Sequence, residues 1–290
     1  MASLLQVGRN TLQKSLKITL NDWTITWIRF FYGLPVILIY YLYVNDLSFS
    51  FNWVNSFFLW LCLGGGICQI LGTYFMMKCF TVRQFAISIS YTKLESIFAA
   101  LIGVVFFADY ISWFGLLLII ISIVGILLIS SKKYSLSFKN NFRSILSSGS
   151  MIGILSGLSF AAASVFFRQA NLSLPILDTT IKGINTLLVV VFIQTVILTV
   201  FLMYKDIQLF LKSFQLYQQG FLTGFFGISA STLWFISFGL ANAAYIKAVG
   251  SIDIIFSLLV GFFVFKESLS LKEILGILLI LFSVLLFTFL

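Results

Sequence analysis

Long apolar runs separated by short polar connections follow one another along the whole 290-residue chain. A helix needs about 20 apolar residues to cross a bilayer, where only helices and closed barrels satisfy the backbone. A barrel strand would alternate polar and apolar residues, and the runs lack that alternation. The pattern predicts an all-α polytopic membrane protein with ten transmembrane helices, at residues 2–18, 23–43, 53–79, 84–106, 111–131, 150–170, 184–204, 219–241, 244–265 and 271–290.

The first run differs from the others because it is short and carries Arg9, Asn10 and Gln13. A cleaved signal peptide fits poorly, since the charge lies inside the run and no small-residue cleavage site follows. We interpret the run as a functional first helix. The sequence leaves open whether Met1 is the true start of that helix.

The longest polar stretch, residues 132–149, contains Lys132, Lys133, Lys139 and Arg143. We interpret this stretch as a basic linker between a first five-helix repeat, residues 1–131, and a second one, residues 150–290.

An internal repeat supports this division. A shift of 158 positions aligns residues 92–107 with residues 250–265 without a gap, so that Glu95 meets Asp253 and Gly103 meets Gly261. The register continues through Asp109 against Glu267. Two apolar helices can resemble one another by chance, but a matched acid, a matched glycine and a shared following turn favour a true repeat.

Five helices per copy is an odd number, which predicts that the second copy is inverted in the membrane, as in many secondary transporters. Twelve of the 18 lysines and arginines fall in connections on one side, against Arg168, Lys182 and Lys247 on the other. Because cytoplasmic connections are enriched in these residues, we expect the linker to be cytoplasmic and both termini to be extracytoplasmic.

The composition excludes several classes of protein. Only 9% of the residues are charged, against roughly 25% in soluble domains. The net charge of +9 does not point to nucleic acid, because the basic residues are scattered singly. The absence of histidine removes His-based catalysis and most transition-metal sites. The three cysteines imply no disulfide framework, and no Walker A loop is present, so we expect no cofactor and no direct use of ATP.

Ionisable residues inside the runs are the candidate site. Lys93 and Glu95 lie near the middle of the fourth run and Asp253 near the middle of the ninth, where a charge costs at least ~2.5–3.5 kcal/mol. Residues two apart on a helix point in different directions, so either Lys93 or Glu95 should pair with a neighbouring helix. One hypothesis is a midplane site for substrate or protons between Glu95 and Asp253, with Lys93, Arg29 and Arg9 supplying positive charge. The alternative is that Arg29 or Arg9 neutralises Glu95 in a packing ion pair.

Polar uncharged residues in the runs add two candidates. Asn10 and Gln69 could hydrogen-bond a polar substrate, although such residues are also common in contacts between helices.

The sequence resembles the drug/metabolite transporter superfamily, in particular its ten-helix EamA-type branch. The likeness rests on the tandem five-helix halves and on residues Gln6–Asn10 and Gln13–Lys14 in the first run, Trp27–Phe30 in the second and Thr92–Glu95 in the fourth. Many relatives carry proline in the middle of the fourth and ninth helices, whereas this chain has only Pro35 and Pro175. Gly250 and Ser251 could loosen the ninth helix instead, and no break is expected in the fourth.

The resemblance implies a secondary transporter, not an enzyme, that exports small organic metabolites such as amino acids or drugs by alternating access, with protons as a candidate coupling ion. The expected location is a bacterial inner membrane, and the expected partners are the lipid bilayer and a small-molecule substrate. A non-transporting assembly or receptor component and an intramembrane lipid-modifying enzyme are the alternatives. Substrate, direction of transport, coupling ion and oligomeric state, monomer or homodimer, are left open by the sequence.

Overall fold

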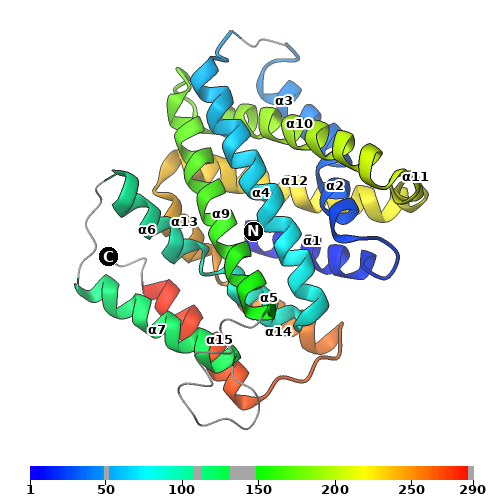
Figure 1. The fold of residues 1–290 in the computed structure, drawn as a ribbon. Helices are drawn as coiled ribbons and strands as arrows, with labels where there is room; N and C mark the ends of the chain where they lie inside the picture. The colour runs from blue at the N-terminus through cyan, green and yellow to red at the C-terminus, as the bar shows by residue number, and fades with distance from the viewer. Residues whose placement is uncertain (49–51, 108–112, 131–147, 287–290) are drawn as a thin grey trace. The chain divides into compact units, whose positions relative to one another are not determined.

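The computed structural model describes residues 1–48, 52–107, 113–130 and 148–286, and its regular structure in these ranges is entirely helical (Figure 1). The helices are α1 (Ala2–Leu16), α2 (Asp22–Phe31), α3 (Leu34–Val44), α4 (Ser56–Val82), α5 (Phe85–Thr92), α6 (Glu95–Phe107), α7 (Trp113–Ser130), α9 (Ser148–Ser173), α10 (Thr179–Lys205), α11 (Ile207–Ser213), η1 (Phe214–Leu216), α12 (Tyr217–Leu240), α13 (Ala243–Gly250), α14 (Asp253–Phe263) and α15 (Leu271–Leu286).

Every predicted run overlaps a helix or a pair of consecutive helices. The second, fourth and ninth runs correspond to the pairs α2–α3, α5–α6 and α13–α14. Within the described residues, seven segments are long and apolar enough to cross a membrane, and α1, α7 and α15 are not among them. The helical class is therefore confirmed, whereas ten crossings and an inverted arrangement of the halves stay predictions. Of the predicted linker, only Ser148 and Gly149 are described, and they open α9; Lys133 and Asp109 lie outside the described residues.

The helix boundaries follow the repeat found in the sequence. Adding 158 to the first residue of α5, 85, gives 243, the first residue of α13. The same shift carries the last residue of α4, 82, to the last residue of α12, 240, and the first residue of α7, 113, to the first residue of α15, 271. Corresponding sequences thus form corresponding helices in the two halves.

The chain forms two compact units that each draw on both halves of the sequence. Unit 1 contains residues 1–70 and 163–242, and unit 2 contains residues 71–162 and 243–290. Helices α4 and α9 each contribute one part to either unit. The compact units therefore differ from the predicted halves, residues 1–131 and 150–290, which describe the repetition of the sequence and stay a prediction.

Unit 1 is organised around α12, which packs against α1, α2 and α10. Glycines allow this close packing: a Cβ atom on Gly224 would lie 2.5 Å from the backbone carbon of Tyr32, and one on Gly183 would lie 2.7 Å from the backbone nitrogen of Ile236. Since only hydrogen fits at these distances, Gly224 of α12 and Gly183 of α10 allow the helices to approach closely.

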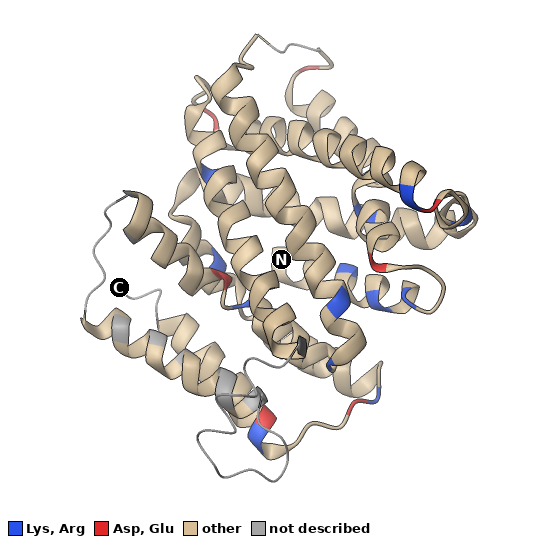
Figure 2. Cartoon of the chain, in the orientation of Figure 1, with Lys and Arg blue, Asp and Glu red and all other residues tan. Residues whose placement is uncertain are grey.

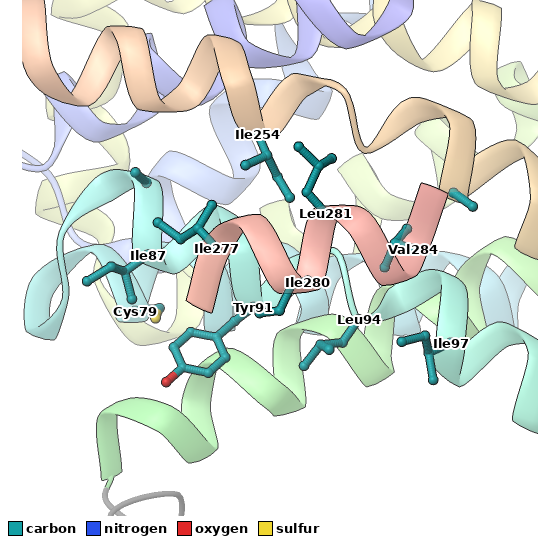
Figure 3. Close-up of a cluster of buried hydrophobic side chains, with 12 residues drawn as sticks. Cys79, Ile87, Tyr91, Leu94, Ile97, Ile254, Ile277, Ile280, Leu281 and Val284 are labelled. Atoms are coloured by element: carbon teal, nitrogen blue, oxygen red, sulfur yellow. The ribbon is translucent and has the colours of Figure 1, made fainter. Parts of the chain in front are cut away.

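Unit 2 is built on crosswise contacts between the two halves of the sequence. Helix α7 lies along α15 (Figure 1), and α5 and α13 also contact α15. Figure 3 shows the apolar cluster at this place, where Ile277, Ile280 and Val284 of α15 meet Ile254 of α14 and Leu94. The Glu267 carboxylate accepts hydrogen bonds from the Phe85 backbone nitrogen at 2.8 and 2.9 Å and so caps the start of α5.

Charged side chains are sparse along the ribbon of the described residues, as Figure 2 shows, whereas large apolar side chains are widely exposed. Phe106, Phe262 and Phe263 are 75%, 65% and 70% exposed. Such surfaces would be unfavourable in water and are normal against lipid. The chain is an integral, multi-pass membrane protein.

Candidate functional site

The fourth and ninth runs are both interrupted, at equivalent positions of the repeat. Helix α5 ends at Thr92 and α6 begins at Glu95, while α13 ends at Gly250 and α14 begins at Asp253. With the shift of 158, 92 becomes 250 and 95 becomes 253, so each acid is the first residue of the second half-helix. The prediction that Gly250 and Ser251 loosen the ninth helix is confirmed, and the expectation of an unbroken fourth helix is wrong.

Hydroxyl groups explain how the fourth helix breaks without proline. The Thr92 hydroxyl donates to the Ile89 carbonyl at 2.7 Å, and the Ser96 hydroxyl donates to the Lys93 carbonyl at 3.1 Å. In the ninth helix, the Ser251 hydroxyl donates to the Lys247 carbonyl at 3.0 Å. Serine and threonine side chains can satisfy backbone groups that an interrupted helix leaves without a helical partner, which makes a break tolerable inside a membrane.

Glycines of α9 give the break in the fourth helix the room it needs. A Cβ atom on Gly157 would lie 2.8 Å from the Tyr91 carbonyl oxygen, and one on Gly153 would lie 2.6 Å from the Tyr91 ring. The Tyr91 hydroxyl also lies 3.0 Å from the Ser150 hydroxyl, to which it donates. The last turn of α5 is thus held against α9.

Lys93, at the break of the fourth helix, forms an ion pair with Asp253 of the ninth helix. The Lys93 ammonium donates to a carboxylate oxygen of Asp253 at 2.7 Å, and the two side chains are 1% and 0% exposed. A buried charge would be costly alone, so each of these charges makes the other tolerable.

A second ion pair joins the other two half-helices, α13 and α6. The Lys247 ammonium of α13 lies 3.2 Å from a carboxylate oxygen of Glu95, with the side chains 11% and 5% exposed. The observed partner of Glu95 is thus Lys247, and the alternative in which Arg29 or Arg9 neutralises Glu95 stays a prediction. Lys93 and Glu95 each pair with a neighbouring helix, which agrees with their spacing of two.

The four half-helices α5, α6, α13 and α14 pack crosswise, and both ion pairs lie in unit 2. Helix α5 packs against α14, and α6 packs against α13. Each acid lies in the first turn of its half-helix, where the positive end of the helix dipole favours a negative charge. We name Lys93, Asp253, Glu95 and Lys247 the ion-pair cluster.

The remaining predicted site residues belong to unit 1. The Asn10 carbonyl oxygen accepts hydrogen bonds from Arg9 at 3.1 and 2.6 Å, and Arg29 donates to the Ser231 hydroxyl at 3.3 Å. The Gln69 carbonyl oxygen accepts from the side-chain amide of Gln194 of α10 at 2.8 Å, the contact between helices that the sequence offered as its alternative role. The structure thus separates the predicted residues into one group per unit.

Lys247 is the functional candidate that sequence reasoning missed. Its position three residues inside the run 244–265 was visible, but it was assigned to the connection before that run. Lys247 lies six residues before Asp253, which is less than two turns of a helix. This short distance from a candidate site residue was the signal in the sequence that could have identified it. Among the described residues, no three His, Cys, Asp or Glu side chains gather as metal ligands would.

Comparison with known proteins agrees with this architecture. The profile of the EamA-like transporter family matches residues 147–289. The match assigns the second half of the chain to the EamA-like transporter family. This match and the long apolar helices support a membrane transporter of the drug/metabolite transporter superfamily that acts on a small-molecule substrate.

A comparison with solved structures supports the fold of this EamA-like transporter. One crystal structure matches with a TM-score of 0.61 and 12% sequence identity, over 99% of this chain and 96% of the other chain. At that identity the similarity concerns the fold alone. No curated protein sequence matches the chain significantly.

Proposed function

We propose that this EamA-like transporter is a proton-coupled secondary transporter that exports small organic metabolites, such as amino acids or drugs, by alternating access. We further propose that it lies in a bacterial inner membrane as two inverted five-helix halves, with the linker in the cytoplasm and both termini outside. The ion-pair cluster carries the proposal. Charges this deep in an apolar protein are costly to retain, and in transporters they mark ion and substrate pathways.

The ion-pair cluster has the chemistry that proton coupling needs. A proton that binds the Asp253 carboxylate removes its negative charge and so ends its attraction to Lys93, and a proton on Glu95 acts in the same way on Lys247. The charged and protonated forms therefore favour different arrangements of the half-helices. The breaks at residues 93–94 and 251–252 are joints at which the half-helices can reorient.

The test compares export by cells that produce the wild-type chain with export by cells that produce Asp253→Asn or Glu95→Gln. Metabolites in the medium are profiled, and those released in a chain-dependent manner are then followed in proteoliposomes with and without an imposed pH gradient. We expect each variant to lower flux at least about tenfold, because general acid–base and ion-pathway carboxylates contribute factors of this size or more. Flux through the wild-type chain should also follow the pH gradient.

The matched control separates a transport role from a packing role. In Lys93→Met/Asp253→Leu, both charges of one pair are replaced by apolar side chains of similar size, which should preserve folding. If this double variant exports at the wild-type rate, the ion-pair cluster is a packing feature and the proposed function is wrong. Normal flux in both single variants would have the same meaning, whereas the absence of any chain-dependent release would favour a non-transporting assembly component.

A further inference from the structure

One face of α1 is polar although it is buried. Arg9, Asn10 and Gln13 are 4%, 0% and 0% exposed. Residues three and four apart lie on the same side of a helix, so Gln13 shares its side with both Asn10 and Arg9. This side packs in unit 1, where α12 is the main neighbour of α1 and the Trp234 indole donates to the Gln6 side-chain carbonyl at 2.9 Å.

Arg29 of α2 approaches the same place on α12. A Cβ atom on Gly227 would lie 3.3 Å from Cδ of Arg9 and 3.2 Å from Cγ of Arg29, so the two side chains pass over one glycine. Arg29 is 2% exposed. Two guanidinium groups in one buried region repel each other, and a negatively charged group between them would be attracted by both.

Two amide groups beside the arginines provide an independent sign of a ligand. Neither the nitrogen nor the oxygen of the Gln13 side chain has a hydrogen-bond partner among the described residues, and the same holds for the side-chain nitrogen of Asn10. Buried amides without partners are costly, so such groups point to a molecule that completes them.

We propose that Arg9, Arg29, Asn10 and Gln13 bind the carboxylate of the transported metabolite, and that the substrates are small zwitterions of the α-amino-acid type. Guanidinium forks and amide N–H groups are the donors that a carboxylate prefers. The Gln13 carbonyl oxygen is an acceptor in the same set and suits a neighbouring ammonium group of the ligand. This assignment rests on the proposed transport function and adds the substrate class to it.

The test measures binding to the purified full-length chain in detergent, by the shift of its thermal unfolding temperature. The probes are the standard amino acids and, for each, the corresponding α-carboxamide, which keeps the ammonium group and removes the negative charge. We expect at least one amino acid to stabilise the protein while its carboxamide binds about 100-fold more weakly or worse, because buried donors that lose a charged partner reject the analogue strongly.

Variants then locate the site. Arg9→Gln and Arg29→Gln should each weaken binding of that amino acid about 10- to 100-fold, the range for loss of a hydrogen bond to a charged group. Arg9→Lys keeps the charge without the fork and should also weaken it. Gly227→Ala retains every polar group and should weaken binding by displacing both arginines. Lys14→Gln removes a charge from the same helix, outside this set, and should bind normally.

Several outcomes would overturn the assignment. These are equal stabilisation by an amino acid and its carboxamide, unchanged affinity in both arginine variants, no stabilisation by any amino acid, or Arg-dependent stabilisation by phosphate or sulfate alone. The transport function is judged separately. Export that depends on Asp253 but is unaffected by Arg9→Gln would contradict the carboxylate site and leave the proposed function intact.

Discussion

The broken fourth helix and the broken ninth helix solve one structural problem with different residues. The fourth places Lys93 and Leu94 at the interruption, after a turn that ends in Tyr91 and Thr92, whereas the ninth places Ser251 and Ile252 there, after Gly250. The position of the break and the acid that follows it are common to both. The two halves of the sequence therefore share the acid at the start of the second half-helix, whereas the residues that break the helix differ between them.

The largest expected effect concerns the lysine that only the fourth helix has at its break. Lys93→Met leaves the Asp253 carboxylate buried beside an apolar side chain and should lower the free energy of unfolding by about 3–5 kcal/mol. Adding Asp253→Leu should restore most of that loss, because the buried carboxylate that had lost its partner is then removed as well. Denaturant or thermal unfolding in detergent measures both. A double variant as unstable as Lys93→Met would show that the pair is not the cause.

Loss of the second ion pair should lower the free energy of unfolding by less. Lys247 and Glu95 are farther apart and more exposed than Lys93 and Asp253. We expect Lys247→Met to lower the free energy of unfolding by about 2 kcal/mol, between the values for exposed and buried pairs. The same unfolding assay applies. A loss equal to that of Lys93→Met would mean that the two breaks are energetically equivalent, which would remove this difference between the helices.

A smaller effect tests the support that the fourth helix receives from α9. Gly157→Ala places a methyl group 2.8 Å from the Tyr91 carbonyl oxygen and should cost roughly 1–2 kcal/mol through overpacking. Gly66→Ala in α4 is the control, since its Cβ would meet its nearest neighbour at an ordinary 3.4 Å. Equal stability of the two variants would show that the break tolerates displacement.

The smallest effect compares the helix caps at the start of the second and seventh runs. Asn21 caps α2 with a neutral amide, whereas Asp178 caps α10 with an exposed carboxylate. Hydrogen bonds from the backbone nitrogens of Ile181 and Thr180 lower the pKa of Asp178. A lowered pKa means that the cap stabilises above the unfolded pKa of about 3.9 and is lost as the pH falls through the folded value. The unfolding temperature of wild type should therefore approach that of Asp178→Asn near pH 3, whereas a constant difference from pH 7 to pH 3 would contradict this role.

The sequence predicted the helices well because apolar length and charge are properties of each run by itself. It failed where the answer depends on contacts between runs. The break at Lys93 relies on hydroxyl groups and on the space left by Gly157, and neither carries a signal as plain as proline. Lys247 was misplaced because depth cannot be read near the end of a run. The convergence of Arg9 and Arg29 on Gly227 depends on how α1, α2 and α12 pack, which no single segment reveals.

The crosswise packing of unit 2 has a consequence for dissecting the protein. Its apolar cluster contains Ile87, Leu94 and Ile97 from the first repeat and Ile254 and Ile277 from the second. Neither repeat therefore forms this part of the hydrophobic core by itself. A fragment that ends before the basic linker and a fragment that starts after it should each be degraded when produced alone. Produced together in one cell they should reassemble, and exchanging one fragment for that of another transporter should fail unless the facing side chains are exchanged with it.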